Sequence, residues 1–322
     1  MSTPRRTAAG SPSGTPSGTP ATPAGTSAGT PGGTARTVLV TGAGRGIGRA
    51  TALHLAARGW DVHGGVRTDA AGAALRAQGV TPVRLDVTDA EDVAALAAAV
   101  PTRLDALVNN VGIAVAGPVE TLSPQDMHRQ LDTNLVGPLA ATRAVLPALR
   151  RARGRILFVS SINGLVSFPF TGLYNASKSA VEAVADCLRV ELGPFGVQVG
   201  LVEPGVVDTD PWHTMDRTLD DLEAALDPGL RELYAPHFAG ERQLVARIRR
   251  GAAPPETVAR AVERALVRRR VRARVLVGRD ARAIRALKAV LPAHALDAVW
   301  SRGLGLAPAS RAPTRVPDAV PR

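Results

Sequence analysis

The sequence predicts a doubly wound α/β fold, with a parallel sheet of about seven strands and helices on both faces. Three observations predict it: short apolar runs recur between residues 36 and 280, stretches with helical spacing separate them, and a glycine-rich turn follows the first run. Apolar strands that alternate with helices pair in parallel through right-handed crossovers. The ligands of such sheets bind at the carboxyl ends of the strands.

The predicted elements follow one another through a single domain. The strands lie within residues 37–41, 61–66, 79–88, 104–110, 154–161, 196–205 and 273–278. The helices lie within residues 49–59, 89–99, 124–149, 174–192 and 255–268. The strand segments are short and apolar, whereas the helical segments repeat apolar residues every three or four positions. One domain over residues 36–280 accounts for all of them.

Two flanking segments differ from this domain in composition. Residues 1–35 consist almost entirely of Ser, Thr, Pro, Gly and Ala, so we expect a disordered tail. Residues 281–322 are basic, and within them residues 281–304 space apolar side chains as an amphipathic helix does, until Pro292 breaks the pattern. We expect this extension to pack on the core or on a second subunit, with contact to a membrane surface as the alternative.

Charge and cysteine content narrow the function classes. The net charge is +11, of which residues 1–36 carry +3 and residues 251–322 carry +10, so the middle of the chain carries −2. A nearly neutral middle with 3% aromatic residues predicts no nucleic-acid partner. The single cysteine, Cys187, excludes an internal disulfide and predicts no metal site. No apolar run is long enough to span a bilayer, so we expect a cytoplasmic protein.

The glycine-rich turn predicts a phosphate site. The stretch VLVTGAGRGIGRATALHL (38–55) contains Gly42, Gly44, Gly46 and Gly48. Glycine permits a tight turn, and the free N–H groups of the following helix bind a pyrophosphate. An ordinary tight turn is the alternative, but the position after the first strand favours a dinucleotide site. Ile47 occupies the place of the last glycine in the commonest dinucleotide motif.

A rare pair of residues predicts acid–base chemistry. The chain has two tyrosines and two lysines against 37 arginines, yet Tyr174 stands four residues before Lys178. Four residues on a helix place both side chains on one face. A nearby ammonium lowers the pKa of a phenol from its ordinary value of about 10. A buried tyrosine beside a surface lysine is the structural alternative.

These motifs resemble the short-chain dehydrogenase/reductase (SDR) family, in particular members acting on hydroxysteroids and retinol. The family's motifs match, in chain order, Thr-Gly-x-x-x-Gly-Ile-Gly at 41–48, the acidic residue Asp86, NNVG at 109–112, Asn134, Ser161, Tyr174 with Lys178, and PGVVDT at 204–209. The departure is Val111, which stands where the family has Ala. The resemblance covers roughly residues 37–280 and implies a Rossmann fold.

The resemblance also implies an activity and its residues. It implies an NAD(P)(H)-dependent oxidoreductase that interconverts a ketone or aldehyde and an alcohol. Tyr174 would exchange the proton, Ser161 would hold the substrate oxygen, and Lys178 with Asn134 would resupply the proton. The implied cofactor-binding residues are Gly42, Gly44, Arg45, Gly46, Ile47, Gly48, Arg67, Asp86, Val87, Asn110, Gly112, Tyr174, Lys178, Pro204, Gly205, Val207 and Thr209.

The end of the second strand bears on the choice of cofactor. An acidic residue there would bind the ribose of NAD and repel the 2′-phosphate of NADP. The sequence instead reads HGGVRTD (63–69), so Arg67 follows the strand directly and Arg45 stands in the glycine turn. We therefore expect NADP(H) over NAD(H), although Asp69 is close enough to leave NAD open.

The substrate is expected to be lipophilic. Residues 206–250 form an insertion that resembles a substrate lid, and Phe168, Phe170 and Trp212 are concentrated near it in an aromatic-poor chain. They predict a pocket for a steroid-, retinoid- or lipid-like molecule, unless they only close the helical subdomain. We expect a homodimer or homotetramer. A catalytically silent NADP(H)-sensing regulator is the alternative function, and a dehydratase or epimerase on the same fold ranks below it.

Overall fold

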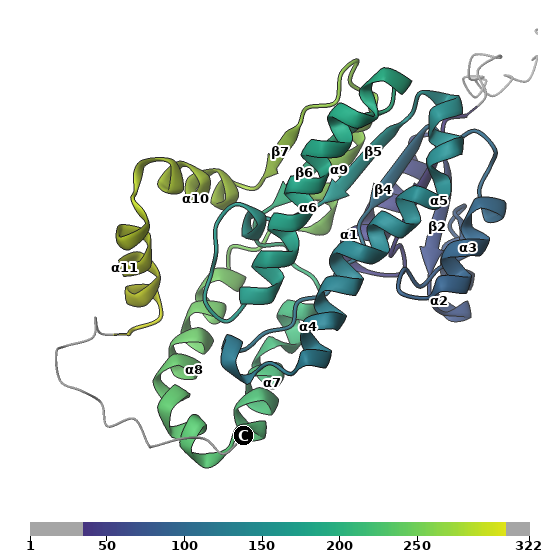
Figure 1. The fold of residues 1–322 in the computed structure, drawn as a ribbon. Helices are drawn as coiled ribbons and strands as arrows, with labels where there is room; N and C mark the ends of the chain where they lie inside the picture. The colour runs from purple at the N-terminus through teal and green to yellow at the C-terminus, as the bar shows by residue number, and fades with distance from the viewer. Residues whose placement is uncertain (1–34, 307–322) are drawn as a thin grey trace, which may run out of the picture. The chain divides into compact units, whose positions relative to one another are not determined.

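The computed structural model of the protein describes residues 35–306 and confirms the doubly wound fold (Figure 1). Seven parallel strands pair in the order β3-β2-β1-β4-β5-β6-β7. The tail expected at residues 1–35 lies almost wholly outside the described residues, as do the last residues of the extension, 307–322.

The strands agree with the predicted segments. They are β1 (Thr37–Val40), β2 (Asp61–Val66), β3 (Thr81–Arg84), β4 (Ala106–Asn109), β5 (Arg155–Val159), β6 (Gln198–Pro204) and β7 (Arg274–Val277). The α-helices are α1 (Gly46–Ala56), α2 (Asp69–Arg76), α3 (Ala90–Ala99), α4 (Pro124–Leu131), α5 (Gly137–Ala152), α6 (Gly172–Glu191), α7 (Asp210–Ala225), α8 (Pro228–Arg249), α9 (Pro255–Val267), α10 (Arg279–Val290) and α11 (Ala293–Gly303). Shorter helical turns are η1 (Val119–Thr121), η2 (Asp132–Val136), η3 (Ile162–Gly164) and η4 (Gly193–Phe195).

Alternation along the strands builds two cores. Side chains of successive strand residues point to opposite faces. Val38 and Val40 pack with the residues of α1 and α9 on one face, whereas Leu39 packs with those of α3, α5 and α6 on the other. Both faces of the sheet are therefore covered, and the edge at the carboxyl ends of the strands is left for a site.

The predicted helix over 124–149 is interrupted in the structure. It divides into α4 and α5, joined by the π-helical turn η2. Asn134 lies in this turn, and its amide is bonded to the backbone of Ile113. An apolar period of three or four does not reveal such a turn, because the turn follows from these tertiary hydrogen bonds.

The lid region and the extension are helical. The expected lid consists of α7 and α8, which lie together below the sheet in Figure 1. The extension consists of α10 and α11, and the predicted break at Pro292 is confirmed, since this residue caps α11. Ile284 and Trp300 of the extension pack with Ile162 and Val166. This described part of the extension therefore packs on the core.

Candidate active site

Thr41 joins the ends of β1 and β4, between which the strand order reverses. Its Oγ1 accepts hydrogen bonds from the backbone N of Asn110 at 3.0 Å and of Val111 at 3.3 Å. The Nδ2 of Asn110 donates in turn to the carbonyls of Thr41 and Gly42, at 3.0 and 3.4 Å. Doubly wound sheets bind their ligands at this reversal point. Asn110 thus fixes the glycine turn at the expected place.

The glycine turn requires glycine for two different reasons. Gly42 and Gly46 have φ angles of 66° and 52°, in the left-handed region that favours glycine. Gly48 is required by close packing, because a Cβ there would lie 2.2 Å from the Gly42 carbonyl oxygen and 2.4 Å from Asn110 Nδ2. The first turn of α1 therefore lies directly against the loop that precedes it.

The start of α1 fits an anionic phosphate group. Arg45 occupies the N-cap position and makes no side-chain cap, and the first turn contains no acidic residue. The first N–H groups of the helix are therefore not capped by the side chain of the N-cap residue, and no acid within the first turn offsets the positive dipole end. Together with the glycines, this arrangement fits the pyrophosphate of a dinucleotide. Ile47 is partly buried against the core behind the turn.

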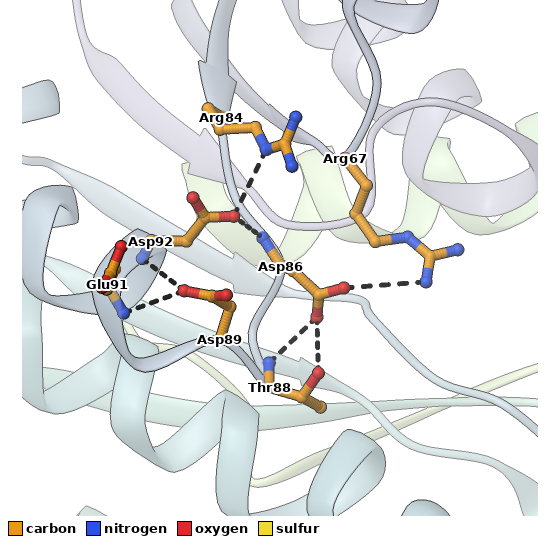
Figure 2. Close-up of polar contacts among 7 residues, drawn as sticks. All are labelled: Arg67, Arg84, Asp86, Thr88, Asp89, Glu91 and Asp92. Atoms are coloured by element: carbon orange, nitrogen blue, oxygen red, sulfur yellow. Dashed lines mark hydrogen bonds and ion pairs between the residues drawn. The ribbon is translucent and has the colours of Figure 1, made fainter.

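Figure 2 shows the polar contacts around Asp86, just beyond β3. Arg67 Nη1 lies 3.8 Å from Asp86 Oδ2, and the Arg67 side chain is 68% exposed. Asp86 Oδ1 accepts from the backbone N and hydroxyl of Thr88, at 3.0 and 2.8 Å. Burial alone would raise the pKa of Asp86, but the Thr88 hydrogen bonds and the charges of Arg67 and Arg84 outweigh it and lower that pKa. Asp86 is thus an ionised carboxylate beside Arg67, whose side chain is largely exposed.

Ser161 and Tyr174 meet at the carboxyl edge of β5. Ser161 is buried and caps η3, where its Oγ accepts from Asn163 N at 3.2 Å. Its hydroxyl also bonds to the phenol of Tyr174, which lowers the pKa of Tyr174, while burial has the larger effect and raises it. The sequence argument expected Lys178 to lower this pKa. The structure differs because the ammonium lies over the ring, 5.7 Å from its centroid.

Lys178 is a buried cation with a fixed direction. It is 5% exposed, and its Nζ donates to the carbonyl of Val159 at 2.9 Å. Burial lowers the pKa of Lys178 to about 8, against the opposing charge of Glu182. A Cβ on Gly112 would lie 3.4 Å from Lys178 Nζ and 3.5 Å from Asn134 Oδ1. Gly112 therefore lets these two side chains approach the same stretch of backbone.

Asn134 reaches the site from the π-helical turn. Its Oδ1 accepts from Ile113 N at 2.8 Å, and its Nδ2 donates to Ile113 O at 2.9 Å and to Ser177 Oγ at 3.0 Å. Ser177 in turn donates to the Tyr174 carbonyl at 2.8 Å. Sequence reasoning missed Ser177, although it stands directly before Lys178. The amide of Asn134 thus connects the chain after β4 to α6 through hydrogen bonds.

The segment after β6 lies against the glycine turn. A Cβ on Gly46 would lie 3.4 Å from Thr209 Cγ2, so this segment contacts the glycine turn. The backbone of Gly205 lies against Asp280, whose Oδ2 accepts from Val206 N at 2.7 Å. No motif marks Asp280 in the sequence, and only the fold brings it here. The remaining predicted cofactor residues also lie along this edge: Gly44, Val87, Pro204 and Val207.

The predicted substrate aromatics occupy separate places. Phe168 packs on Trp300, with ring centroids 4.7 Å apart, and Phe170 is buried against Phe238 at 5.1 Å. Trp212 lies in the first turn of α7 and is partly exposed. Phe170 and Phe238 belong to an apolar cluster with the lid residues Met215, Leu219, Leu222, Leu226 and Tyr234. Phe168 and Phe170 therefore pack against the extension and the expected lid, respectively.

Two surface cavities among the described residues are not lined by Ser161, Tyr174 or Lys178. One, of about 440 Å³, is lined by residues that include Phe168, Asn175 and Trp300. The other, of about 460 Å³, lies at the start of α1 and includes Gly46 and Thr209. Within residues 35–306, no group of three or more His, Cys, Asp and Glu side chains is arranged to hold a metal ion.

Comparisons with known proteins identify the family of the chain. The family model "short chain dehydrogenase" matches residues 36–220. Mouse retinol dehydrogenase 5 is 35% identical over 276 residues, which cover 81% of this chain and 86% of that protein. The 3-ketodihydrosphingosine reductase of Bacteroides thetaiotaomicron is 32% identical over 248 residues, or 75% and 87% of the two chains. A solved short-chain dehydrogenase of Burkholderia cenocepacia, in complex with NADP, superposes with a TM-score of 0.65 at 28% identity, over 83% of this chain and 97% of that one.

The fold and the site define an NAD(P)-dependent oxidoreductase. The chain belongs to the short-chain dehydrogenase family, as its motifs predicted, and it resembles the retinol dehydrogenases among the members of that family. None of the helices in residues 35–306 combines the length and apolar character that crossing a membrane requires.

Proposed function

We propose that the protein interconverts a lipophilic ketone or aldehyde and the corresponding alcohol, with NADP(H) as the preferred cofactor and Tyr174 as the acid–base group. The observation that carries the proposal is the convergence of three side chains at the end of β5. Ser161 bonds to the phenol of Tyr174, and Lys178 lies over the same ring. A regulator that only senses the cofactor needs the glycine turn and has no use for these three groups.

Each of these residues has a separate role in proton transfer. In the reducing direction, Tyr174 donates its proton to the substrate oxygen, and Ser161 donates a hydrogen bond that stabilises the charge developing there. Lys178, whose Nζ lies 5.7 Å from the centre of the Tyr174 ring, would then resupply the proton to the phenolate together with Asn134. The dinucleotide, when bound, supplies hydride transfer, and Gly42, Gly46 and the start of α1 would hold its phosphates.

The preference for NADP(H) is supported by two exposed arginines. Arg67 and Arg45 are each 68% exposed, and their ion pairs with Asp86 and Asp210 are long, at 3.8 and 3.6 Å. Long pairs at exposed positions are weak, so each guanidinium is available to a phosphate. The Burkholderia cenocepacia neighbour was solved with NADP. Replacing Arg67 by Asp should reduce the NADP/NAD ratio of kcat/KM by about 10–100-fold, since it exchanges attraction for repulsion. An unchanged ratio would remove this assignment.

The lipophilic substrate is supported by the lid and by the relatives. Phe170 and the lid helices present an apolar cluster beside the site. Two of the similar proteins are named for retinol and for 3-ketodihydrosphingosine. We therefore place steroid-, retinoid- and long-chain lipid-like carbonyl compounds first among the candidates. Turnover of small polar ketones combined with no turnover of these compounds would count against this substrate class.

The test of the function is a carbonyl panel. Purified protein is incubated with NADPH and each compound, and oxidation of the nicotinamide is followed by absorbance. We expect turnover of at least one lipophilic carbonyl, and a loss of about 10²–10⁴-fold in Tyr174→Phe with NADPH binding retained. Tight NADPH binding without turnover across a broad panel would favour the sensing regulator.

Assembly and membrane contact are further parts of the proposal. Val136 and Val190, next to α5 and on α6, are 54% and 75% exposed, which supports a homodimer or homotetramer through these helices. Sedimentation of a monomer at micromolar concentration would exclude it. Peripheral membrane contact through the extension is supported by its basic residues and by Val290, which is 75% exposed. Retention of the whole protein in the supernatant with anionic vesicles would exclude that contact.

A further inference from the structure

A cluster of buried and half-buried polar side chains lies under α6, one helical turn beyond Lys178. We call it the carboxylate cluster, and it consists of Ser160, Glu182, Glu203 and Arg274. Its two glutamates are 5% and 0% exposed. Buried carboxylates are costly unless they are paired or protonated. The proton transfer at Tyr174 does not touch these residues, so their presence behind the site calls for a physical reason.

The strand register brings this cluster together. Ser160 N donates to the Val202 carbonyl at 2.8 Å, so Ser160 and Glu203 are neighbours at the ends of β5 and β6. Alternation places both on the sheet face that α6 covers. A Cβ on Gly164 would lie 3.0 Å from Ser160 Oγ and 3.0 Å from Glu182 Cγ. Glycine at 164 therefore allows Ser160 and Glu182 to approach from opposite sides.

One arginine serves several carboxylates here. Arg274 Nε lies 2.8 Å from Glu182 Oε2 and 3.3 Å from Glu203 Oε1, and its Nη2 lies 2.7 Å from Asp186 Oδ2. Asp186 is also paired with Arg189, at 2.5 Å. Arg274 Nε lies closer to Glu182 than to Glu203, so it pairs mainly with Glu182. Among the described residues, Arg274 is the one arginine within 4.0 Å of either buried glutamate.

Glu203 has no hydrogen-bond donor for either oxygen, and Glu182 Oε1 has none either. Two facing acceptors are satisfied when one of them carries a proton, because a protonated acid donates to a carboxylate. Burial and the adjacent Glu182 raise the pKa of Glu203 to about 8, against the charges of Arg274 and Arg285. Glu203 is therefore the carboxyl that holds the proton at neutral pH.

We propose that protonated Glu203 donates a hydrogen bond to Glu182, and that the one negative charge left on the pair keeps the buried ammonium of Lys178 protonated. Glu182 and Glu203 are then positioning residues for the acid–base reaction, and this role rests on the proposed function of Tyr174 and Lys178. Glu182 stands four residues after Lys178 on α6, so both lie on one face of the helix. The other charged groups that face the pair are Asp186, Arg189, Arg274 and Arg285.

The chain offers a direct test, because it has two lysines, Lys178 and Lys288. Lysine labelled with ¹³C gives one side-chain signal for each by NMR, and Lys288→Arg assigns them. We expect the pKa of Lys178 to fall by about one unit or more in Glu182→Gln, because the opposing charge is lost. Glu203→Gln should leave it nearly unchanged, since Gln keeps the shape and the donor of a protonated Glu. Glu191→Gln, the same change at an exposed position of α6, is the matched control.

Two results would overturn the proposal. One is a Lys178 titration that does not move in Glu182→Gln, and the other is a Glu203→Gln effect equal to the Glu182→Gln effect. If Glu182→Gln does not fold, the infrared carbonyl band of protonated carboxylic acids at pH 7 replaces it: because burial also raises the pKa of Glu241 to about 7, the band must be weaker in Glu203→Gln than in the wild type. These readouts need no substrate. A failed carbonyl panel with a shifted Lys178 therefore rejects the function and leaves the charge relation intact.

Discussion

Lys178 is buried with its Nζ held by the Val159 carbonyl, and burial lowers its pKa to about 8. The ammonium, which in our proposal resupplies the proton to Tyr174, is therefore lost as the pH rises through about 8. We predict that kcat/KM falls above this pH, with one proton released. The pH profile of the reduction reaction measures this limb, and a flat profile up to pH 10 would contradict it.

Glu203 yields a prediction for the pH dependence of stability. The ordinary pKa of 4.5 is raised to about 8 in the folded protein, so folded Glu203 keeps a proton that the unfolded chain has released. The wild type should therefore lose about 1.4 kcal/mol of unfolding free energy per pH unit relative to Glu203→Gln between those values, and the difference should level off above about pH 8. Denaturant unfolding of both proteins at several pH values measures the difference. Parallel stability curves would contradict a raised pKa.

The residues of the candidate site were named from sequence motifs, but the motifs did not give their burial, contacts or pKa. Ser161, Tyr174 and Lys178 stand at motif spacings that a single chain reveals. Burial of Lys178 and the direction of its ammonium depend on Val159, which is distant in sequence. The raised pKa of Tyr174 follows from burial, a property of the folded site that spacing does not report.

At the scale of elements, the proposed cofactor site lies where the glycine turn meets α1. A Cβ on Gly48 would lie 2.2 Å from the Gly42 carbonyl oxygen, which cannot move without displacing the turn. We predict that Gly48→Ala weakens NADPH binding at least about tenfold and lowers the unfolding temperature, since overpacking costs about 1–3 kcal/mol. Gly193→Ala is the matched control, because a Cβ there meets nothing within 4 Å. Equal NADPH affinities of the two variants would refute this role of Gly48.

The lid is joined to the domain by a hydrogen bond between its helix α8 and the turn η1. Tyr234 donates to Glu120, and burial, with the charge of Glu120, raises the pKa of Tyr234 to about 12. A hydrogen bond to a carboxylate contributes about 1.5–3 kcal/mol. Tyr234→Phe should therefore speed amide hydrogen exchange of α7 and α8 by about tenfold, while Leu233→Ala, at an exposed neighbour, leaves it unchanged. Identical exchange in Tyr234→Phe and the wild type would show that this bond does not hold the lid.

Some elements follow from the local sequence pattern, whereas others depend on tertiary contacts. Strands and helices of the sheet region agree with apolar periodicity, because each is decided by which side chains must be buried. The π-helical turn at Asn134 and the contact of Asp280 with Val206 depend on partners far along the chain. Neither follows from the local pattern.

At the scale of the whole molecule, residues 279–303 continue the domain as helices packed beside the core. Phe168 and Trp300 pack 4.7 Å apart, and Gly240 of α8 lies against the backbone of Leu304. The extension therefore contacts both the loop before α6 and the lid. Composition could not decide between this packing and a membrane surface, because the same apolar spacing serves both.

We propose that Ser161, Tyr174 and Lys178 together form the active site for oxidoreduction. The most direct measurement is transfer of deuterium from NADPH deuterated at the nicotinamide C4 to a lipophilic carbonyl compound, read by the mass of the alcohol product. The account predicts one deuterium in the product with the wild type and a rate reduced by about 10²–10⁴-fold in Tyr174→Phe at saturating NADPH. Deuterium transfer at the same rate in both proteins, or tight NADPH binding with no transfer to any carbonyl, would contradict it.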